Sequence, residues 1–295
     1  MYNQWQQNRV DQPTPHKILR KTAMAAVDTH TATTQSLREQ ALDGTPLHGT
    51  LVIDNHCHLG PAPHFYQTYN DAAGMVATMD RIGMDQACVF STMAIMFDMR
   101  EGNDRSLEAA RQYPGRLLAY GVPDPHEAEL VRDELQRCID AGAVGIKMHA
   151  GVAQYPFEGP GYRPAFELAD RHRLPLISHG TGTPDTLRRI AREYPGCHFI
   201  VAHAAGANPH KTIDLVMVAA EEPNVYLDTA ASVGYRGDFT EMVRLAGANK
   251  ILYGSDMPWT CATYQLGRVL LAPITDAEKR LILGENLAEL FKTKR

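Results

Sequence analysis

The feature that most constrains this chain is a regular alternation between short apolar runs and longer helical patterns. Eight runs rich in aliphatic and β-branched residues occupy 51–56, 86–91, 116–122, 143–148, 174–178, 198–202, 224–228 and 250–254. Amphipathic helical patterns separate them, for example at 127–141, 184–196 and 275–291. Strands that alternate with helices predict a parallel sheet whose connections are right-handed crossovers.

The number of strand–helix units separates two parallel architectures. Eight units in about 240 residues match the size of a (β/α)8 barrel. An open doubly wound sheet is the alternative, but no GxGxxG or P-loop sequence follows any run, so its nucleotide-binding form loses its main support. We therefore predict an α/β fold, a (β/α)8 TIM barrel over residues 51–295 with an N-terminal extension over residues 1–50.

The first 50 residues differ from the rest because they are polar, rich in Thr and Gln, and carry only short apolar groups. One short helix is expected at 33–44, where Gly44 supplies a C-terminal stop. We interpret this extension as a peripheral arm and not as a domain. A lid over the barrel is the alternative.

Charge and cysteine content exclude several classes of protein. The 29 basic and 34 acidic residues give a formal net charge of −5 without a Lys/Arg cluster, which argues against nucleic acid and anionic membranes as partners. The five cysteines are scattered and form no CxxC, which favours a reduced, cytoplasmic protein. No apolar stretch approaches the roughly 20 residues that span a bilayer, and the start is too polar for a secretory signal. We expect a small-molecule substrate and a homodimer.

Polar residues gather where the predicted strands end. Five of the eight strands finish in the sequences IDNHCH, GIKMH, LISHG, IVAHAAG and LYGSDMPW. In a parallel barrel these carboxyl ends carry the chemistry. A buried rim rejects His, Lys and Asp unless they are paired or bound to a ligand, so the pattern predicts a functional site.

His56 and His58 lie one residue apart at the end of the first strand. The two-residue period of a strand places both on one face and Cys57 on the other, so Cys57 is not a candidate ligand. Two converging imidazoles can bind one cation, although either histidine alone could be a hydrogen-bonded rim residue. Asp54 shares their face and is expected to support one of the ligands.

Three further side chains at equivalent heights on other strands favour a metal centre: His179, His203 and Asp256. Imidazole and carboxylate ligands without thiolate suit Zn²⁺ best, with Mn²⁺, Fe²⁺ or Co²⁺ as alternatives. We expect one ion, or two if a second site is completed. For Asp256 a rim salt bridge or a helix cap is the alternative.

These strand-end sequences, in this order, resemble the metal-dependent amidohydrolase superfamily. They are most similar to its amidohydrolase-related (amidohydrolase 2) branch, which includes aminocarboxymuconate semialdehyde decarboxylase and 2-pyrone-4,6-dicarboxylate hydrolase, over about residues 51–291. The resemblance implies that the metal ligands are His56, His58, His179 and Asp256. It implies that His203 is catalytic in a one-metal enzyme or binds the second metal in a two-metal enzyme.

The chemistry expected of these residues agrees with that resemblance. Asp256 could ligate through one oxygen and act as base through the other, because a metal lowers the pKa of bound water to about 7. His203 could then polarise a carbonyl or protonate a leaving group. Lys147 has two interpretations: a carboxylated lysine that bridges two metals, or an ion pair with Asp256 or a substrate carboxylate, which we favour.

Other residues near the strand ends are candidates for substrate binding. His149 shares the face of Lys147, although a hydrogen-bonded rim histidine is the commoner case. Arg236 could clamp a carboxylate, or be a solvated loop arginine. Trp259 could form the floor or the cap of the pocket, or it could have only a packing role. Phe65 in the first loop could contact substrate.

The main functional hypothesis is a metal-dependent hydrolase that uses metal-activated water on an ester, lactone or amide carbonyl of a small carboxylated substrate. The alternative is a metal-dependent decarboxylase, a C–C lyase of an unsaturated or aromatic carboxylic acid. A non-catalytic scaffold is a third class, but the presence of both Asp256 and His203 argues against it, since a structural zinc site needs no base.

Overall fold

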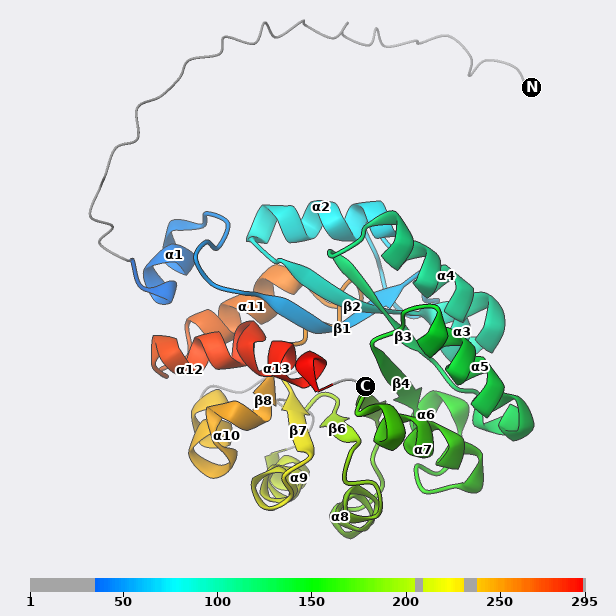
Figure 1. Ribbon diagram of the computed structural model, residues 1–295. Helices are drawn as coiled ribbons and strands as arrows, with labels where there is room; N and C mark the ends of the chain where they lie inside the picture. The colour runs from blue at the N-terminus through cyan, green and yellow to red at the C-terminus, as the bar shows by residue number, and fades with distance from the viewer. Residues whose placement is uncertain (1–34, 205–208, 231–237, 294–295) are drawn as a thin grey trace, which may run out of the picture. The chain divides into compact units, whose positions relative to one another are not determined.

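A computed structural model of the chain describes residues 35–204, 209–230 and 238–293. Its centre is one sheet of eight parallel strands in sequence order, surrounded by helices (Figure 1). The strands are β1 (Ile53–Leu59), β2 (Gln86–Ser91), β3 (Leu117–Gly121), β4 (Gly145–His149), β5 (Pro175–His179), β6 (His198–Val201), β7 (Val225–Asp228) and β8 (Ile251–Leu252).

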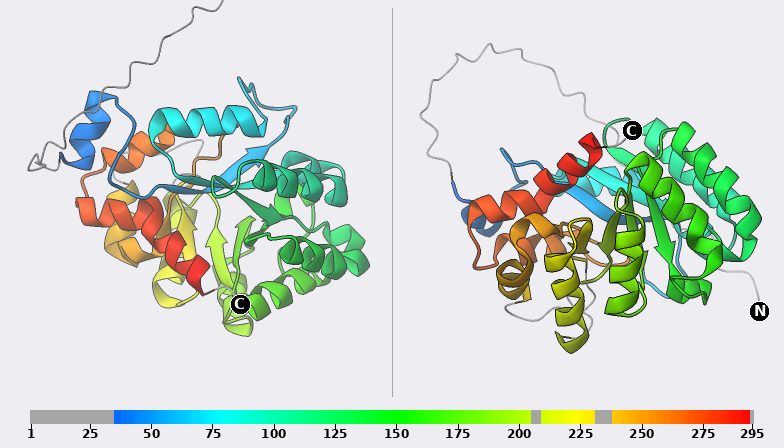
Figure 2. Two further views of the ribbon diagram at one scale, coloured as in Figure 1. Left: turned by 45° about the horizontal axis from the view of Figure 1, so that its top comes forward. Right: turned by 60° about the horizontal axis from the view of Figure 1, so that its bottom comes forward.

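The helices lie on the outside of the strands, as the further views in Figure 2 show. The α-helices are α1 (Leu37–Asp43), α2 (Ala72–Ile82), α3 (Thr92–Met96), α4 (Met99–Gln112), α5 (Ala128–Asp140), α6 (Ala150–Ala153), α7 (Arg163–His172), α8 (Pro184–Glu193), α9 (Pro209–Glu221), α10 (Asp238–Ala246), α11 (Ala262–Leu270), α12 (Asp276–Arg280) and α13 (Asn286–Lys292). A π-helical segment, Leu281–Glu285, joins α12 to α13, and short 3-10 helices are η1 (Pro125–Glu127), η2 (Pro160–Tyr162) and η3 (Ala248–Lys250). Within the described ranges, no helix is long and apolar enough to cross a membrane.

Backbone hydrogen bonds close the sheet into a barrel. The segment that follows β8 runs beside β1, where Asn55 N donates to Tyr253 O at 2.9 Å and His58 N donates to Met257 O at 2.8 Å. The predicted (β/α)8 barrel is therefore confirmed, and the open doubly wound alternative is wrong.

The barrel interior is filled by side chains and not by an open channel. Its cluster includes Ile53, Cys88, Phe90, Tyr120, Ile177, Ile200 and Leu252. Leu287 and Leu290 of α13 belong to the same cluster, and His198 at the start of β6 lies 3.0 Å from Thr293 Oγ1. Helix α13 therefore covers the end where strands begin, which leaves the opposite end for polar side chains.

The short helix expected near residue 40 is present as α1. Ser36 caps it in a reciprocal capping box with Glu39, and Gly44 ends it with φ 68° in the left-handed region. Leu37 is completely buried, and its backbone N–H donates to Asp276 Oδ2 at 2.9 Å. The compact unit that contains the barrel begins at Gln35, and residues 1–34 of the predicted extension lie outside the described residues.

Candidate metal centre

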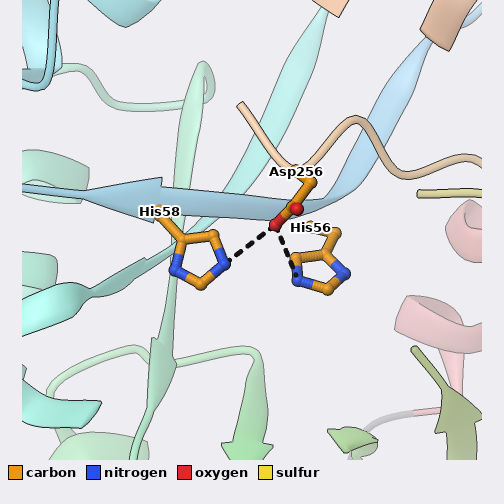
Figure 3. A group of neighbouring side chains, drawn as sticks. All are labelled: His56, His58 and Asp256. Carbon is orange, nitrogen blue, oxygen red and sulfur yellow. Dashed lines mark ion pairs between the residues drawn. The ribbon is translucent and has the colours of Figure 1, made fainter. Parts of the chain in front are cut away.

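Two imidazoles and one carboxylate meet at the carboxyl ends of the strands (Figure 3). His56 and His58 come from β1, and Asp256 comes from the segment after β8. His58 Nε2 lies 3.0 Å and His56 Nε2 lies 3.4 Å from Asp256 Oδ1, and one ligand atom of each residue lies within 4.8 Å of the others. Asp256 has φ 62°, a left-handed conformation that non-glycine residues adopt at a cost and that is enriched at functional sites.

The residues fit a divalent metal ion. Asp256 Oδ1 is buried and makes no hydrogen bond within the described part of the chain, although two ring nitrogens are directed at it. An unpaired buried acceptor costs free energy, and a cation bound between the three ligand atoms would remove that cost. Two imidazoles with a carboxylate form a ligand set that Zn²⁺, Mn²⁺, Fe²⁺ and Co²⁺ accept. The predicted His56, His58 and Asp256 thus come together.

Asp228, at the end of β7, supports His56. His56 Nδ1 donates to Asp228 Oδ2 at 2.9 Å, and the Asn55 side-chain amide donates to the same oxygen at 2.9 Å. The other oxygen accepts the Ala230 N–H. Because Nδ1 holds the proton, Nε2 keeps its lone pair on the side of Asp256. Burial raises the pKa of Asp228, whereas the Ala230 N–H and the charge of Lys147 lower it.

The sequence predicted that Asp54 supports one of the ligands, and Asp54 does so through the backbone of His56 and not through its imidazole. The pairing of β1 with β2 shifts between Asp54 and Cys57, so β1 contains one extra residue there. The simple two-residue alternation therefore does not extend back from His56 to Asp54. Asp54 Oδ1 instead accepts the backbone N–H groups of His56 and Ser255, and ties the two ligand-bearing segments together.

Both β1 imidazoles are held in the neutral form that metal binding requires. His56 and His58 are buried, and burial lowers the pKa of each well below its usual value. The charge of Lys147 lowers both pKa values further. Neutral rings need not lose a proton before their nitrogens can coordinate an ion.

Lys147 lies inside the barrel beside the ligands, as predicted. Its Nζ is 3.0 Å from His56 Nε2 and 4.5 Å from the centre of the Phe90 ring. Burial lowers its pKa to about 8, and the charges of Asp256 and Asp228 oppose that shift. Both interpretations of Lys147, the favoured ion pair and the carboxylated lysine that bridges two metals, stay predictions.

Three more histidines line the same end of the barrel. The ring of His203 lies 4.8 Å from that of His56 and 4.6 Å from that of His179, which in turn stacks on His149 at 4.1 Å. His203 Nδ1 donates to Ala230 O at 3.2 Å, so its Nε2 is free to act on a ligand. His179 is not among the three clustered ligand atoms, and its role as a fourth ligand stays a prediction. His149 Nδ1 accepts the Val152 N–H, which also gives this histidine a local structural role.

Aromatic rings surround His58. Trp259 stacks on it with 3.4 Å between ring centres and 14° between planes, and Phe65 stacks on Trp259 at 4.7 Å. Phe90 meets His58 edge-on at 4.7 Å. Trp259 and Phe65 were expected near the pocket, whereas Phe90 and Asp228 were missed although both lie at the ends of predicted strands. Arg236 lies outside the described residues.

Solved structures with the same fold include several decarboxylases. A 2,6-dihydroxybenzoate decarboxylase from Rhizobium is 18% identical with a TM-score of 0.67, covering 83% of this chain and 99% of that one. A 5-carboxyvanillate decarboxylase from Sphingomonas paucimobilis is 14% identical with a TM-score of 0.66, covering 83% and 99%. A dihydroxybenzoic acid decarboxylase from Polaromonas sp., with bound manganese and the inhibitor 2-nitroresorcinol, is 17% identical with a TM-score of 0.66, covering 83% and 98%. At these identities the likeness shows the fold alone.

Comparison with curated proteins gives no match. A family model described as Amidohydrolase matches residues 53–293, which includes the whole barrel from β1 to α13 and all three clustered ligands. The chain therefore belongs to the amidohydrolase family.

Proposed function

We propose that the protein is a metal-dependent decarboxylase, a C–C lyase that acts on an aromatic or unsaturated carboxylic acid. One observation carries the proposal: a His–His–Asp group flanked by aromatic rings lies in a barrel that resembles, over most of its length, decarboxylases of hydroxylated benzoic acids. This favours the alternative of the sequence analysis over its main hypothesis, hydrolysis.

The reaction makes defined demands on the site. The bond between the ring carbon and the carboxylate breaks, CO2 leaves, and the electron pair of that bond stays with the carbon, which must receive one proton. A divalent ion, when bound, supplies positive charge that holds the substrate's oxygen atoms. The chain must therefore orient a planar acid, exclude water and deliver a proton.

Asp256 and His203 are placed for that proton transfer. Burial raises the pKa of Asp256, whereas the charges of His203 and Lys147 lower it. We assign one oxygen of this carboxylate to the ion and the other to the proton transfer. His203 is adjacent to His56, and its bond to Ala230 O fixes its orientation with Nε2 available to the substrate. Burial lowers the pKa of His203 to about 4, so this imidazole is neutral near pH 7 and can accept or share a proton.

Hydrolysis of an ester, lactone or amide is the second candidate, and Lys147 favours it. A carboxylated Lys147 that bridges two ions would support this reaction, and its amine lies inside the barrel, 3.0 Å from His56 Nε2. We propose Mn²⁺ or Zn²⁺ as the ion for either reaction. We also propose the cytoplasm as the location, supported by five cysteines that are all free and of which four are buried.

The test is a direct comparison of products. Metal-loaded protein is incubated with a panel of dihydroxybenzoates and 5-carboxyvanillate, and with lactones and aryl esters, while release of CO2 and of acid is measured in parallel. We expect release of CO2 from at least one aromatic acid. In Asp256→Asn the rate of CO2 release should fall by at least about a hundredfold, as for removal of a general acid. The rate should not change in the matched control Asp185→Asn, whose side chain is 96% exposed. Acid release without CO2 release would overturn the proposal in favour of hydrolysis.

A further inference from the structure

The two histidines of β1 are held in different ways. His56 donates its Nδ1 proton to Asp228, which fixes the ring and its tautomer. His58 Nδ1 is buried and has no hydrogen-bond partner among the residues that the structure describes. Histidines that bind metals almost always donate their second N–H to an acceptor, because an untethered ring must lose its rotational freedom when the ion binds. Another contact must therefore orient His58.

Aromatic rings on two sides of His58 supply that contact. Trp259 lies nearly parallel to the imidazole, at 3.4 Å and 14°, and Phe90 of β2 meets it at 82°. A ring packed against one face and one edge cannot turn about its Cβ–Cγ bond without displacing a neighbour. Phe65, which is 39% exposed, stacks on Trp259 at 4.7 Å and 12° and extends the stack away from His58.

The backbone joins Trp259 to the metal centre. Trp259 N donates to Asp256 O at 2.9 Å, so a single turn after β8 carries both the carboxylate ligand and the indole. Asp256 N in turn donates to His56 O at 2.8 Å. A displacement of this turn would thus move a ligand and the ring that packs on another ligand together.

We propose that Trp259 is the positioning residue of His58. Ring stacking orients His58, whereas a hydrogen bond to Asp228 orients His56. Phe65 covers the outer part of the stack. The inference goes beyond the proposed reaction, because it rests on His56, His58 and Asp256 binding a metal and not on which substrate is converted.

Metal affinity measured without turnover tests this role. The dissociation constant of Mn²⁺ or Zn²⁺ is obtained for the full chain by competition with a chromophoric chelator. We expect Trp259→Leu to weaken binding by at least about tenfold, the range found for loss of an outer partner of a metal ligand. Trp259→Phe, which keeps an aromatic face, stays within about threefold, and Phe65→Leu lies between them. The control Tyr264→Leu removes a half-exposed ring on α11 and leaves affinity unchanged.

Melting of the metal-free variants separates positioning from general stability. If Trp259→Leu lowers the metal-free melting temperature but binds metal within twofold of the wild type, the proposal is wrong. If Trp259→Leu does not fold, the variants Trp259→Phe and Phe65→Leu test the proposal instead. An unchanged metal affinity in Phe65→Leu together with a tenfold loss of affinity in Trp259→Phe would contradict a role based on stacking.

Tryptophan fluorescence gives an independent readout. The chain has two tryptophans, Trp5 and Trp259, so Trp5→Phe leaves the stacked indole as the sole emitter. We expect Mn²⁺ to quench this emission with the midpoint found by chelator competition, because the indole packs directly on a ligand. Metal binding that leaves the emission unchanged would overturn the proposed contact.

Discussion

At the scale of single residues, one buried carboxylate fixes the orientation in which His56 can bind an ion. Asp228 accepts from His56 Nδ1 and from the Asn55 amide through the same oxygen, so its position is fixed by two donors. The lone pair of His56 Nε2 is thereby directed at Asp256 Oδ1, which accepts no hydrogen bond from any described residue. Orientation before binding lowers the conformational entropy that the ion must otherwise offset.

Asp228→Asn should weaken metal binding by about ten- to a hundredfold. If the asparagine keeps its oxygen toward His56, its NH2 group faces the Ala230 N–H. In the flipped rotamer the NH2 group faces His56 and Asn55. Two donors face each other in either case. Chelator competition measures the change, with Asp185→Asn as the surface control. Wild-type affinity in Asp228→Asn would show that His56 is oriented by other contacts.

Lys147→Met should tighten binding of a single ion by about tenfold and leave the stoichiometry at one. The ammonium lies 3.0 Å from the nitrogen that an ion would use, and two like charges so close together repel each other. Elemental analysis with chelator competition measures both quantities. A fall from two ions to one in this variant would instead identify Lys147 as a bridging ligand.

At the scale of elements, strand positions were predictable and details within a strand were not. The predicted runs at 86–91 and 174–178 correspond to β2 and β5 within one residue, because apolar runs bounded by turn residues repeat along the chain. The extra residue in β1 was not predictable, since a bulge leaves the composition of a strand unchanged. Asp228 was missed for a related reason: a lone Asp at a strand end gives no sign of its partner until β7 and β1 are placed in one barrel.

Helix α1 offers a matched test of which residues belong to the barrel unit. Leu37→Ala should destabilise the protein by about 2–4 kcal/mol, because Leu37 is completely buried and its removal leaves a cavity. Leu42→Ala in the same helix, where the side chain is 63% exposed, should change stability by less than about 0.5 kcal/mol. Urea unfolding measures both. Equal effects would mean that α1 does not pack on the barrel as described.

At the scale of the whole molecule, closure of the barrel creates the metal centre. His56 and His58 lie near the start of the compact unit and Asp256 lies near its end, and they meet because the segment after β8 runs beside β1. The ligands therefore exist as a group only in the folded barrel. Metal binding should stabilise the closed state by mass action, since the unfolded chain has no such group.

The metal centre is tested most directly by anomalous diffraction from crystals of the Mn²⁺- or Zn²⁺-loaded protein, recorded at the absorption edge of the metal. We expect one principal peak at coordination distance, about 2.0–2.3 Å, from His56 Nε2, His58 Nε2 and Asp256 Oδ1. A loaded crystal whose anomalous peaks all lie away from these three atoms would contradict this prediction.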